Sequence, residues 1–304
     1  MDEFGLIRRY FTRDARSAVV GVGDDGAVLA PTPGSQQVQV IDTLVERVHF
    51  PSTMKAADVG YRVVAVNLSD IAAMGATPRW MTLALTLRDK DEQWVGEFAA
   101  GLFEAADEHG VDLVGGDTTQ GDVVVTTIHI TGEVEQDKAL LRSGARVGDT
   151  IFVTGTIGDA AAGLGLFQDG RQDDFLTHRF LRPTARIAEG RALTGVATAC
   201  IDISDGLVGD LRKLCDASGV GAEVDVDCVP LSDPLVEHFG AERARHFALT
   251  GGDDYELCFT APADSVAGVT DVTAIGSIVA GDEIVCRSGG DIVEVDDSGY
   301  RHFA

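Results

Sequence analysis

Acidic residues set inside apolar or glycine-rich segments are the feature that most limits how this chain can fold. They are Asp24, Asp25, Asp42, Asp70, Asp117, Asp202 and Asp205. An isolated carboxylate is costly to bury, so each of these residues needs a partner. The nearby basic residues that could neutralise some of them are Arg47, Arg62, Arg79 and Arg142. Hard divalent cations, which prefer oxygen ligands, would satisfy the whole set.

The overall acidity of the chain weakens any argument from charge alone. The chain has 49 Asp and Glu residues against 24 Lys and Arg, a formal net charge of −25. Chance will therefore bring some carboxylates into pairs that resemble metal sites. Because like charges repel, we expect neither a nucleic acid nor an anionic membrane as a partner.

Length and composition favour two domains. The chain has 304 residues, 45% of them hydrophobic, which is enough apolar material for two cores. The stretch from Glu135 to Asp149 is polar, contains Gly144 and Gly148, and separates two apolar runs. A boundary near this stretch gives domains at residues 1–137 and 138–304.

The sequence predicts a cytosolic protein with reduced thiols. No segment approaches the roughly 18 uninterrupted apolar residues of a membrane helix. The first residues include Asp2, Glu3, Arg8 and Arg9 instead of an apolar signal. The cysteines never form a C-x-x-C pair, which favours reduced, buried thiols over a zinc site. They are Cys200, Cys215, Cys228, Cys258 and Cys286.

Apolar periodicity predicts an α/β protein in both halves. Residues 92–109 have the spacing of an amphipathic helix closed by Gly110, and residues 56–74 form a second predicted helix that stops at Gly75. Strands are predicted in the first half at 38–45, 79–87, 111–114 and 123–134. The second half should contain strands at 151–154 and 200–204, helices at 159–167, 185–193 and 207–217, and short strands from 222 to 295 around a helix at 234–247.

One segment, Gly21 to Gly26, matches the dinucleotide fingerprint G-x-G-x-x-G but lacks its context. The last glycine of that fingerprint opens a helix, whereas Ala27 to Pro31 resembles a strand here. Asp24 and Asp25 would also repel a pyrophosphate approaching without metal. A plain Asp-Gly turn remains an alternative. A Walker loop is excluded, because G-x-x-x-x-G-K-[ST] does not occur.

Four further features have both a structural and a functional interpretation. The turn Gly155 to Asp159 joins a strand to a helix and could offer amides to a phosphate, or it could simply pack. The glycine-rich turn Gly115 to Thr119 combines close backbone approach with a carboxylate and two hydroxyls, which favours function. The acidic segment Gly251 to Leu257 and the lone His49 stay open between the two interpretations.

Six runs in this order resemble the thiamine-monophosphate kinase family, and together they span nearly the whole chain. Any one of these runs alone would be weak evidence for the family. They are Gly23-Asp24-Asp25, Asp42-Thr43-Leu44-Val45 with His49-Phe50, Ala65 to Gly75, Gly115-Gly116-Asp117-Thr118-Thr119, Ile201-Asp202-Ile203-Ser204-Asp205-Gly206-Leu207, and Gly251-Gly252-Asp253-Asp254-Tyr255-Glu256-Leu257.

The resemblance implies the two-lobed α/β fold of the aminoimidazole-ribonucleotide synthetase superfamily, with the first lobes of two subunits pairing into a barrel. It therefore implies a homodimer that uses ATP and thiamine monophosphate. The implied ligands of several Mg²⁺ ions are Asp25, Asp42, Asp70, Asp117, Asp202 and Asp205. Gly116, Asp117, Arg142 and Ser204 would contact ATP. His49 and Asp253 would meet the thiamine phosphate.

Two departures from the family pattern affect the implied site. Val40-Ile41 stand where members often carry Ser-Thr, so a metal contact at Ile41 must come from its backbone carbonyl. Asp297 stands where some members place an aromatic residue over the thiamine. Tyr300 or Phe303 could take that role.

The implied reaction makes thiamine diphosphate by direct, in-line transfer of a phosphoryl group. The acceptor is a phosphate monoester whose second ionisation lies near pH 6, so it needs no general base. The difficulty is bringing two polyanions together, which several cations and a fixed geometry would overcome. The residues expected to carry catalysis are Asp117, Arg142 and Asp205.

Four rival functions are weighed against this one. A hydrogenase-maturation carbamoyl dehydratase is expected to end in a reactive cysteine, whereas this sequence ends in Phe303-Ala304. Selenophosphate synthetase is weakened because no cysteine precedes Cys200. A magnesium-dependent phosphohydrolase could use the same carboxylates and would release phosphate from ATP alone. A nucleotide sensor would bind ATP without turnover.

Overall fold

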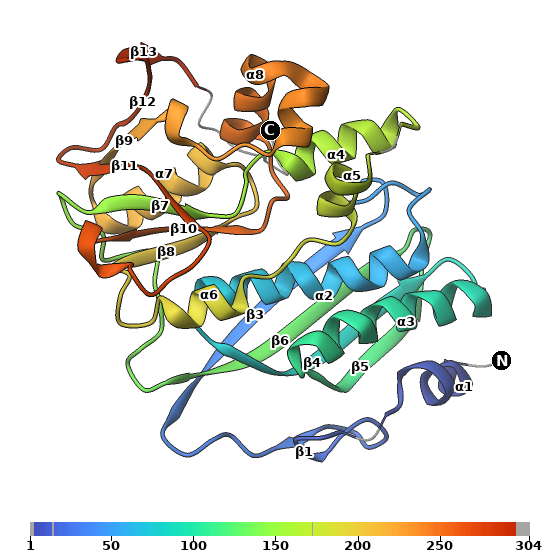
Figure 1. Ribbon diagram of the computed structural model, residues 1–304. Coiled ribbons are helices and arrows are strands. Elements are labelled where there is room, and N and C mark those ends of the chain that lie inside the picture. The colour runs from blue at the N-terminus through green and yellow to red at the C-terminus, as the bar shows by residue number, and fades with distance from the viewer. Residues whose placement is uncertain (1–2, 14, 172, 296–304) are drawn as a thin grey trace. The chain divides into compact units, whose positions relative to one another are not determined.

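Two large β-sheets organise the chain, and each belongs to its own structural unit (Figure 1). The structure, a computed structural model, describes residues 3–13, 15–171 and 173–295. The first unit comprises Met1–Ile71 and Ala76–Asp137, and the second comprises Ala72–Gly75 and Lys138–Ala304. The mixed α/β character predicted from the sequence is confirmed in both units.

The first unit contains a four-stranded mixed sheet with two long helices on one face (Figure 1). The strand order is β3-β6-β4-β5, in which only the β4–β5 pair is parallel. The elements are β3 (Ser35–Val45), α2 (Ala56–Ala73), β4 (Thr77–Leu87), α3 (Glu92–His109), β5 (Asp112–Gln120) and β6 (Val125–Glu135).

Side chains of this sheet alternate between a core face and an open face, as the period of a strand requires. In β3, Val38 and Leu44 are buried, whereas Ile41 is 65% exposed. Threonines of neighbouring strands pair on the sheet, with Thr43 Oγ1 2.8 Å from Thr127 Oγ1 and Thr86 Oγ1 3.0 Å from Thr119 Oγ1. The open face of β3 is therefore polar except for Ile41 and, at the end of the strand, Val45.

Helix α3 matches its predicted bounds because both of its ends are encoded locally. Asp91 accepts hydrogen bonds from the N–H groups of Gln93 and Trp94 at the N-terminus. Gly110 ends the helix with φ 66°, a left-handed conformation that favours glycine. Helix α2 ends in the same way before Gly75, with φ 68°.

The first 34 residues contain three elements that the sequence did not predict, which are α1 (Glu3–Leu6), the π-helix η1 (Ile7–Phe11) and β1 (Ala18–Val20). The strand expected within Ala27 to Pro31 is confirmed as β2 (Val28–Leu29). Strands β1 and β2 pair antiparallel. A strand, not a helix, thus follows the segment Gly21 to Gly26, which confirms that the dinucleotide fingerprint is a false match.

The second unit is built on a seven-stranded sheet in the order β13-β12-β9-β11-β7-β10-β8. Its strands are β7 (Thr150–Thr154), β8 (Ala199–Ile203), β9 (Gly221–Asp225), β10 (Glu256–Ala261), β11 (Val272–Val279), β12 (Ile284–Ser288) and β13 (Asp291–Val293). Its helices are α4 (Asp159–Gln168), α5 (Asp174–Leu181), α6 (Ile187–Ala192), α7 (Leu207–Ser218) and α8 (Asp233–Thr250), with short 3₁₀ turns η2 (Val226–Cys228) and η3 (Ala263–Ser265). Buried Ile151, Ile201 and Leu211 belong to its largest hydrophobic cluster.

Two predictions about local structure need correction. Residues 115–119 are not a turn but part of strand β5, because Gly115 to Gln120 continue the parallel register with Thr82 to Leu87. Helix α5 was not predicted, since its eight residues are too few for a clear apolar period. Asp173 caps this short helix by accepting from the N–H groups of Phe175 and Leu176.

The cysteines confirm the sequence interpretation in four of five cases. Cys200, Cys215, Cys258 and Cys286 are buried free thiols, but Cys228 is exposed. Burial raises the pKa of the Cys258 thiol well above its usual value, so this thiol stays protonated and unreactive. Within the described ranges, no helix combines the length and apolarity that crossing a membrane requires.

We predict that a methyl group at Gly101 destabilises the packing of α3 on α2. A Cβ atom there would lie 1.8 Å from the carbonyl oxygen of Ala57, so the helices must separate. Gly101→Ala should lower the free energy of unfolding by about 3 kcal/mol, measured by urea denaturation.

The matched control is Gly165→Ala in α4, where a Cβ atom meets nothing within 4 Å. This change should raise stability by about 0.5 to 1 kcal/mol through helix propensity alone. Equal effects of the two substitutions would contradict the close packing of α2 and α3.

Candidate active site

Asp42 is held on the core face of the first unit by a hydrogen bond from strand to helix. Its backbone N–H donates to Oδ1 of Asn67 in α2 over 3.0 Å, and the Nδ2 group of Asn67 donates to the carbonyl of Val63 over 2.8 Å. Asn67 is fully buried, so its side chain serves the fold and does not offer oxygen to a ligand. Asp42 and Asp70 are both half-buried.

Gly116 places Asp117 at the free edge of the sheet. A Cβ atom at Gly116 would lie 2.0 Å from the carbonyl oxygen of Leu83, so only glycine allows β5 to approach β4 this closely. Asp117 follows with an exposed side chain. Beside it lies a small pocket of about 50 Å³, lined by Ile7, Phe11, Val22, Leu83, Leu113, Gly115, Gly116, Asp117 and Thr118.

The segment that carries Asp24 and Asp25 is anchored at both ends by buried carboxylates. At one end, the N–H and hydroxyl groups of Ser17 donate to Asp112 Oδ2 over 2.8 and 2.7 Å. At the other end, the N–H and hydroxyl groups of Thr32 donate to Glu133, both over 2.7 Å. Asp24 and Asp25 themselves are exposed. Asp112 and Glu133 thus hold the two ends of the segment, whereas Asp24 and Asp25 within it face solvent.

His49 has a defined tautomer in its neutral form. The N–H of Val45 donates to His49 Nδ1 over 3.0 Å, so Nδ1 carries no proton and the ring proton resides on Nε2. The turn between Val45 and Phe50 includes Arg47 at φ 69°. The half-buried imidazole is therefore positioned by the backbone that precedes it.

Two loops of the second unit lie against each other and carry several of the predicted residues. The N–H of Asp253 donates to the carbonyl of Ser204 over 2.9 Å, and the N–H of Tyr255 donates to the carbonyl of Ile203 over 2.8 Å. A Cβ atom at Gly252 would lie 2.5 Å from the Ser204 carbonyl oxygen. The structure thus brings together Ser204, predicted to contact ATP, and Asp253, predicted to contact the thiamine phosphate.

Asp205 is bound by a lysine that the sequence reasoning missed. Lys213 Nζ lies 2.6 Å from Asp205 Oδ2 and 2.8 Å from Asp210 Oδ1. Burial raises the pKa of Asp210, which accepts from the N–H groups of Ser204 and Asp205 over 2.9 and 2.8 Å. Asp210 thereby fixes the Ser204–Asp205 backbone, and Lys213 places a positive charge beside Asp205. The position of Lys213 in the sequence, two helical turns after Gly206, was the signal that could have predicted its contact with Asp205.

Amide groups at the turn from Gly155 to Asp159 are hydrogen-bonded to another part of the protein. The carboxyl group of Asp254, which is fully buried, accepts from the N–H groups of Gly158 and Ala160 over 2.7 and 3.2 Å at the start of α4. These are the donors that a phosphate would need. The packing interpretation of this turn is therefore favoured over phosphate binding.

The remaining predicted residues occupy varied surroundings. Arg142 is exposed on the segment that follows the first unit, and Asp202 is 5% exposed in β8. Asp297, Tyr300 and Phe303 lie outside the described residues. Among the residues that the structure describes, no three His, Cys, Asp or Glu side chains form a ready-made metal site. The predicted metal ligands therefore stay a prediction.

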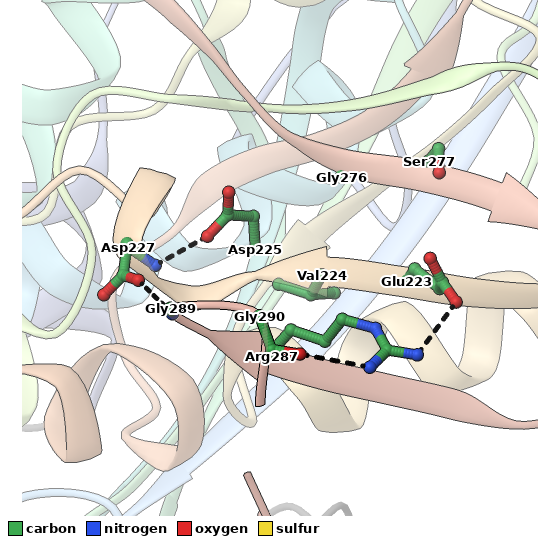
Figure 2. A pocket seen from close by; sticks show the side chains of 9 residues that line it. All are labelled: Glu223, Val224, Asp225, Asp227, Gly276, Ser277, Arg287, Gly289 and Gly290. Carbon is green, nitrogen blue, oxygen red and sulfur yellow. Dashed lines mark hydrogen bonds and ion pairs between the residues drawn. The ribbon is translucent and has the colours of Figure 1, made fainter. Parts of the chain in front are cut away.

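A larger open cavity of about 440 Å³ lies elsewhere in the second unit, between β9, β11 and β12 (Figure 2). Charged groups that line it are bound by an ion pair or by backbone N–H groups. Arg287 pairs with Glu223 over 3.5 Å, and Asp227 accepts from the N–H of Gly289 over 2.7 Å. These contacts fix the strand ends, and none of the lining residues was predicted to be functional.

Two family models match this chain. AIR synthase related protein, N-terminal domain, matches residues 23–134, and AIR synthase related protein, C-terminal domain, matches residues 146–289. The thiamine-monophosphate kinase of Escherichia coli (strain K12) is 45% identical over 322 residues, covering 99% of this chain and 98% of that protein. The Aquifex aeolicus (strain VF5) enzyme of the same name is 34% identical, covering 100% and 98%.

Solved structures give the same assignment. Thiamine-monophosphate kinase from Stenotrophomonas maltophilia K279a has a TM-score of 0.85 at 42% identity, covering 95% of this chain and 96% of that one. AaThiL complexed with AMPPCP and TMP has a TM-score of 0.83 at 33% identity, covering 90% and 89%. E. coli HypE, a hydrogenase maturation protein, has a TM-score of 0.79 at 17% identity, covering 96% and 95%, which shows a shared fold alone.

We predict that Asp254 makes stability fall as the pH rises. Burial raises the pKa of its carboxyl from 3.8 to about 8, although Arg179 and two backbone donors oppose the shift. The folded state therefore binds this proton more tightly than the unfolded chain does, and stability declines between about pH 4 and pH 8. Asp254→Asn should reduce this decline by about 1 to 3 kcal/mol between pH 5 and pH 8, measured by urea unfolding.

The control for this experiment is Asp216→Asn on the exposed side of α7. It should leave the pH dependence unchanged. An Asp254→Asn protein with the wild-type slope would contradict a protonated Asp254 in the folded state.

Proposed function

This chain belongs to the thiamine-monophosphate kinases of the AIR synthase related family, and on that premise we propose that it transfers the terminal phosphoryl group of ATP to thiamine monophosphate, giving thiamine diphosphate. The observation that carries this proposal is the identity of 45% to a thiamine-monophosphate kinase over nearly the full length of both chains. The likeness to AaThiL complexed with AMPPCP and TMP supports the same pair of ligands. A cytosolic location remains the expectation from the sequence.

Magnesium fits the donor chemistry that the first unit presents. Asp24, Asp25 and Asp117 are exposed carboxylates, and hard oxygen donors of this kind suit Mg²⁺. We propose that several Mg²⁺ ions are held by Asp25, the Ile41 carbonyl, Asp42, Asp70, Asp117, Asp202 and Asp205. When bound, magnesium would neutralise phosphate charge so that two polyanions can approach.

The chain's own residues would then bind and orient the two phosphorylated substrates. Gly116, whose backbone lies close against Leu83 of β4, and Arg142, an exposed cation, would contact ATP. His49, with its proton on Nε2, could donate a hydrogen bond to the phosphate of the thiamine ester. Ser204 and Asp253, which are hydrogen-bonded neighbours, would meet ATP and the acceptor respectively.

Transfer is proposed to be direct and in line. The acceptor phosphate is mostly ionised at neutral pH, so its oxygen can attack without a general base. The residues then have to fix geometry and balance charge, for which Asp117, Arg142 and Asp205 are the candidates. A stable phosphoenzyme, or retention of configuration at a chiral phosphorus, would rule this route out.

A homodimer is proposed through the open face of the first sheet. Ile41 is 65% exposed at the centre of edge strand β3, among the polar side chains Gln39 and Thr43. An exposed apolar residue on a sheet surface suits contact with a second copy of the same chain. The pairing of first lobes that the resemblance implies would cover this face.

We predict that Ile41→Glu weakens this dimer, because two carboxylates would be buried in a face that repeats in both copies. The molar mass measured by light scattering should be about twice the chain's 32.0 kDa for the unmodified protein and 32.0 kDa for the variant. Val147→Glu alters a residue that is 63% exposed in the second unit and should keep the larger mass. A monomeric unmodified protein would contradict the proposal.

We predict that the purified protein forms thiamine diphosphate from ATP and thiamine monophosphate, and that a chelator stops the reaction. Asp117→Asn should lower kcat by about 100-fold or more, since it removes one negative charge with little change in volume. Product formation is followed by fluorescence after oxidation to thiochrome.

The control is Asp122→Asn, which removes a charge from another exposed carboxylate near the end of β5. It should keep kcat within about twofold of the unmodified protein. Normal turnover by Asp117→Asn would tell against a metal-ligand role for Asp117. Release of phosphate from ATP without thiamine monophosphate would favour a phosphohydrolase, and tight ATP binding without turnover would favour a sensor.

A further inference from the structure

The loop between α8 and β10 holds two residues in a strained backbone conformation. Asp253 has φ 73° and Tyr255 has φ 54°, both in the left-handed region that residues other than glycine rarely adopt. The side chains of these two residues meet, with the Tyr255 hydroxyl donating to Asp253 Oδ1 over 3.2 Å. Such strain persists only where surrounding contacts determine the conformation.

Asp254, between the two strained residues, is fixed on its side chain and on its backbone. Its carboxyl group accepts from the N–H groups of Gly158 and Ala160. Its carbonyl oxygen accepts from Arg179 Nη2 over 3.3 Å. Because Asp254 points into the core, the neighbouring Asp253 side chain stays half-buried near the surface.

Arg179 of α5 joins this carbonyl to a buried carboxylate. The same Nη2 atom donates to Glu256 Oε1 over 2.7 Å, and Arg179 is only 8% exposed. Glu256 is fully buried and also accepts from Arg186 Nε over 2.6 Å, Arg186 Nη2 over 2.8 Å and Thr154 Oγ1 over 2.5 Å. Several hydrogen bonds thus fix the position of Glu256. Arg179 connects the loop between α8 and β10 to it.

We propose that Arg179 is a positioning residue for the substrate site: it holds the Gly251–Tyr255 loop in the conformation that presents Asp253. This inference rests on the proposed function, in which Asp253 meets the thiamine phosphate. Arg179 acts through the loop backbone and not by touching the substrate, because its side chain is enclosed by Asp254 and Glu256. A loosened loop would weaken the binding of thiamine monophosphate more than that of ATP.

The first test is the kinetics of Arg179→Lys. Lysine keeps the positive charge but is shorter, so its ammonium cannot reach the position of Nη2. The KM for thiamine monophosphate should rise about 10-fold, whereas the KM for ATP should stay within about twofold. Arg245→Lys, which alters an exposed ion pair to Asp227 in the same unit, should change neither constant.

A second variant keeps the proposal testable if Arg179→Lys does not fold. Thr154→Val has nearly the same volume, and it removes the hydroxyl that donates to Glu256 and accepts from the N–H of Leu257. It should raise the KM for thiamine monophosphate in the same direction but less, by about twofold to fivefold. Near-UV circular dichroism confirms that both variants are folded at the assay temperature.

Hydrogen exchange tests the positioning role without using activity. The amides of Asp253 and Tyr255 donate to Ser204 and Ile203, and they should exchange at least about 10-fold faster in Arg179→Lys, with the amides of β6 unchanged. If the unmodified protein makes no thiamine diphosphate, the proposed function fails while this readout still tests the loop. Unchanged exchange at Asp253 and Tyr255, or an equal rise in both KM values, would overturn the positioning role.

Discussion

Hydrogen bonds from the backbone to buried carboxylates organise both units of this protein. In the first unit, Asp112 and Glu133 anchor the two ends of the segment that carries Asp24 and Asp25. In the second unit, Asp210 holds the Ser204–Asp205 backbone and Asp254 caps the start of α4. A buried carboxylate is tolerated only with such donors, so each one forces a fixed arrangement of the backbone around it.

This arrangement separates the acidic residues into two classes with different roles. One class is buried, has its oxygens occupied by N–H, hydroxyl or ammonium donors and acts on the fold; its members are Asp112, Glu133, Asp210 and Asp254. The exposed ones, such as Asp25 and Asp117, keep their oxygens accessible to a cation. The formal charge of −25 is therefore not a uniform property of the chain, because part of it supports loops and part of it can attract metal.

The sequence predicted the elements whose signals are local and missed what depends on distant partners. Helix α3 matched its predicted bounds because Asp91 and Gly110 cap it directly. The neighbours Asp253 and Asp254 share one motif, yet one is half-buried and the other is fully enclosed. Their difference is set by Gly158, 96 positions away from Asp254, and no local pattern carries that information.

The resemblance in the sequence predicted the family, which the comparisons confirm. It also named more candidate site residues than any single pattern did, and these stay a prediction. It gave no signal for Lys213 or Arg179, because these residues bind the motifs from outside them. The sequence interpretation of Gly116 was close backbone approach, and the structure shows that the approaching group is the carbonyl of Leu83, which leaves no room for a Cβ atom.

The central claim is that buried acidic residues support the fold whereas exposed ones bind metal. Its most direct test is the binding of Mn²⁺, a paramagnetic substitute for Mg²⁺, measured by electron paramagnetic resonance in the presence of AMPPCP. The account predicts that Asp117→Asn loses bound Mn²⁺, whereas Asp254→Asn binds as much as the unmodified protein. Full Mn²⁺ binding by Asp117→Asn, together with a loss in Asp254→Asn, would contradict it.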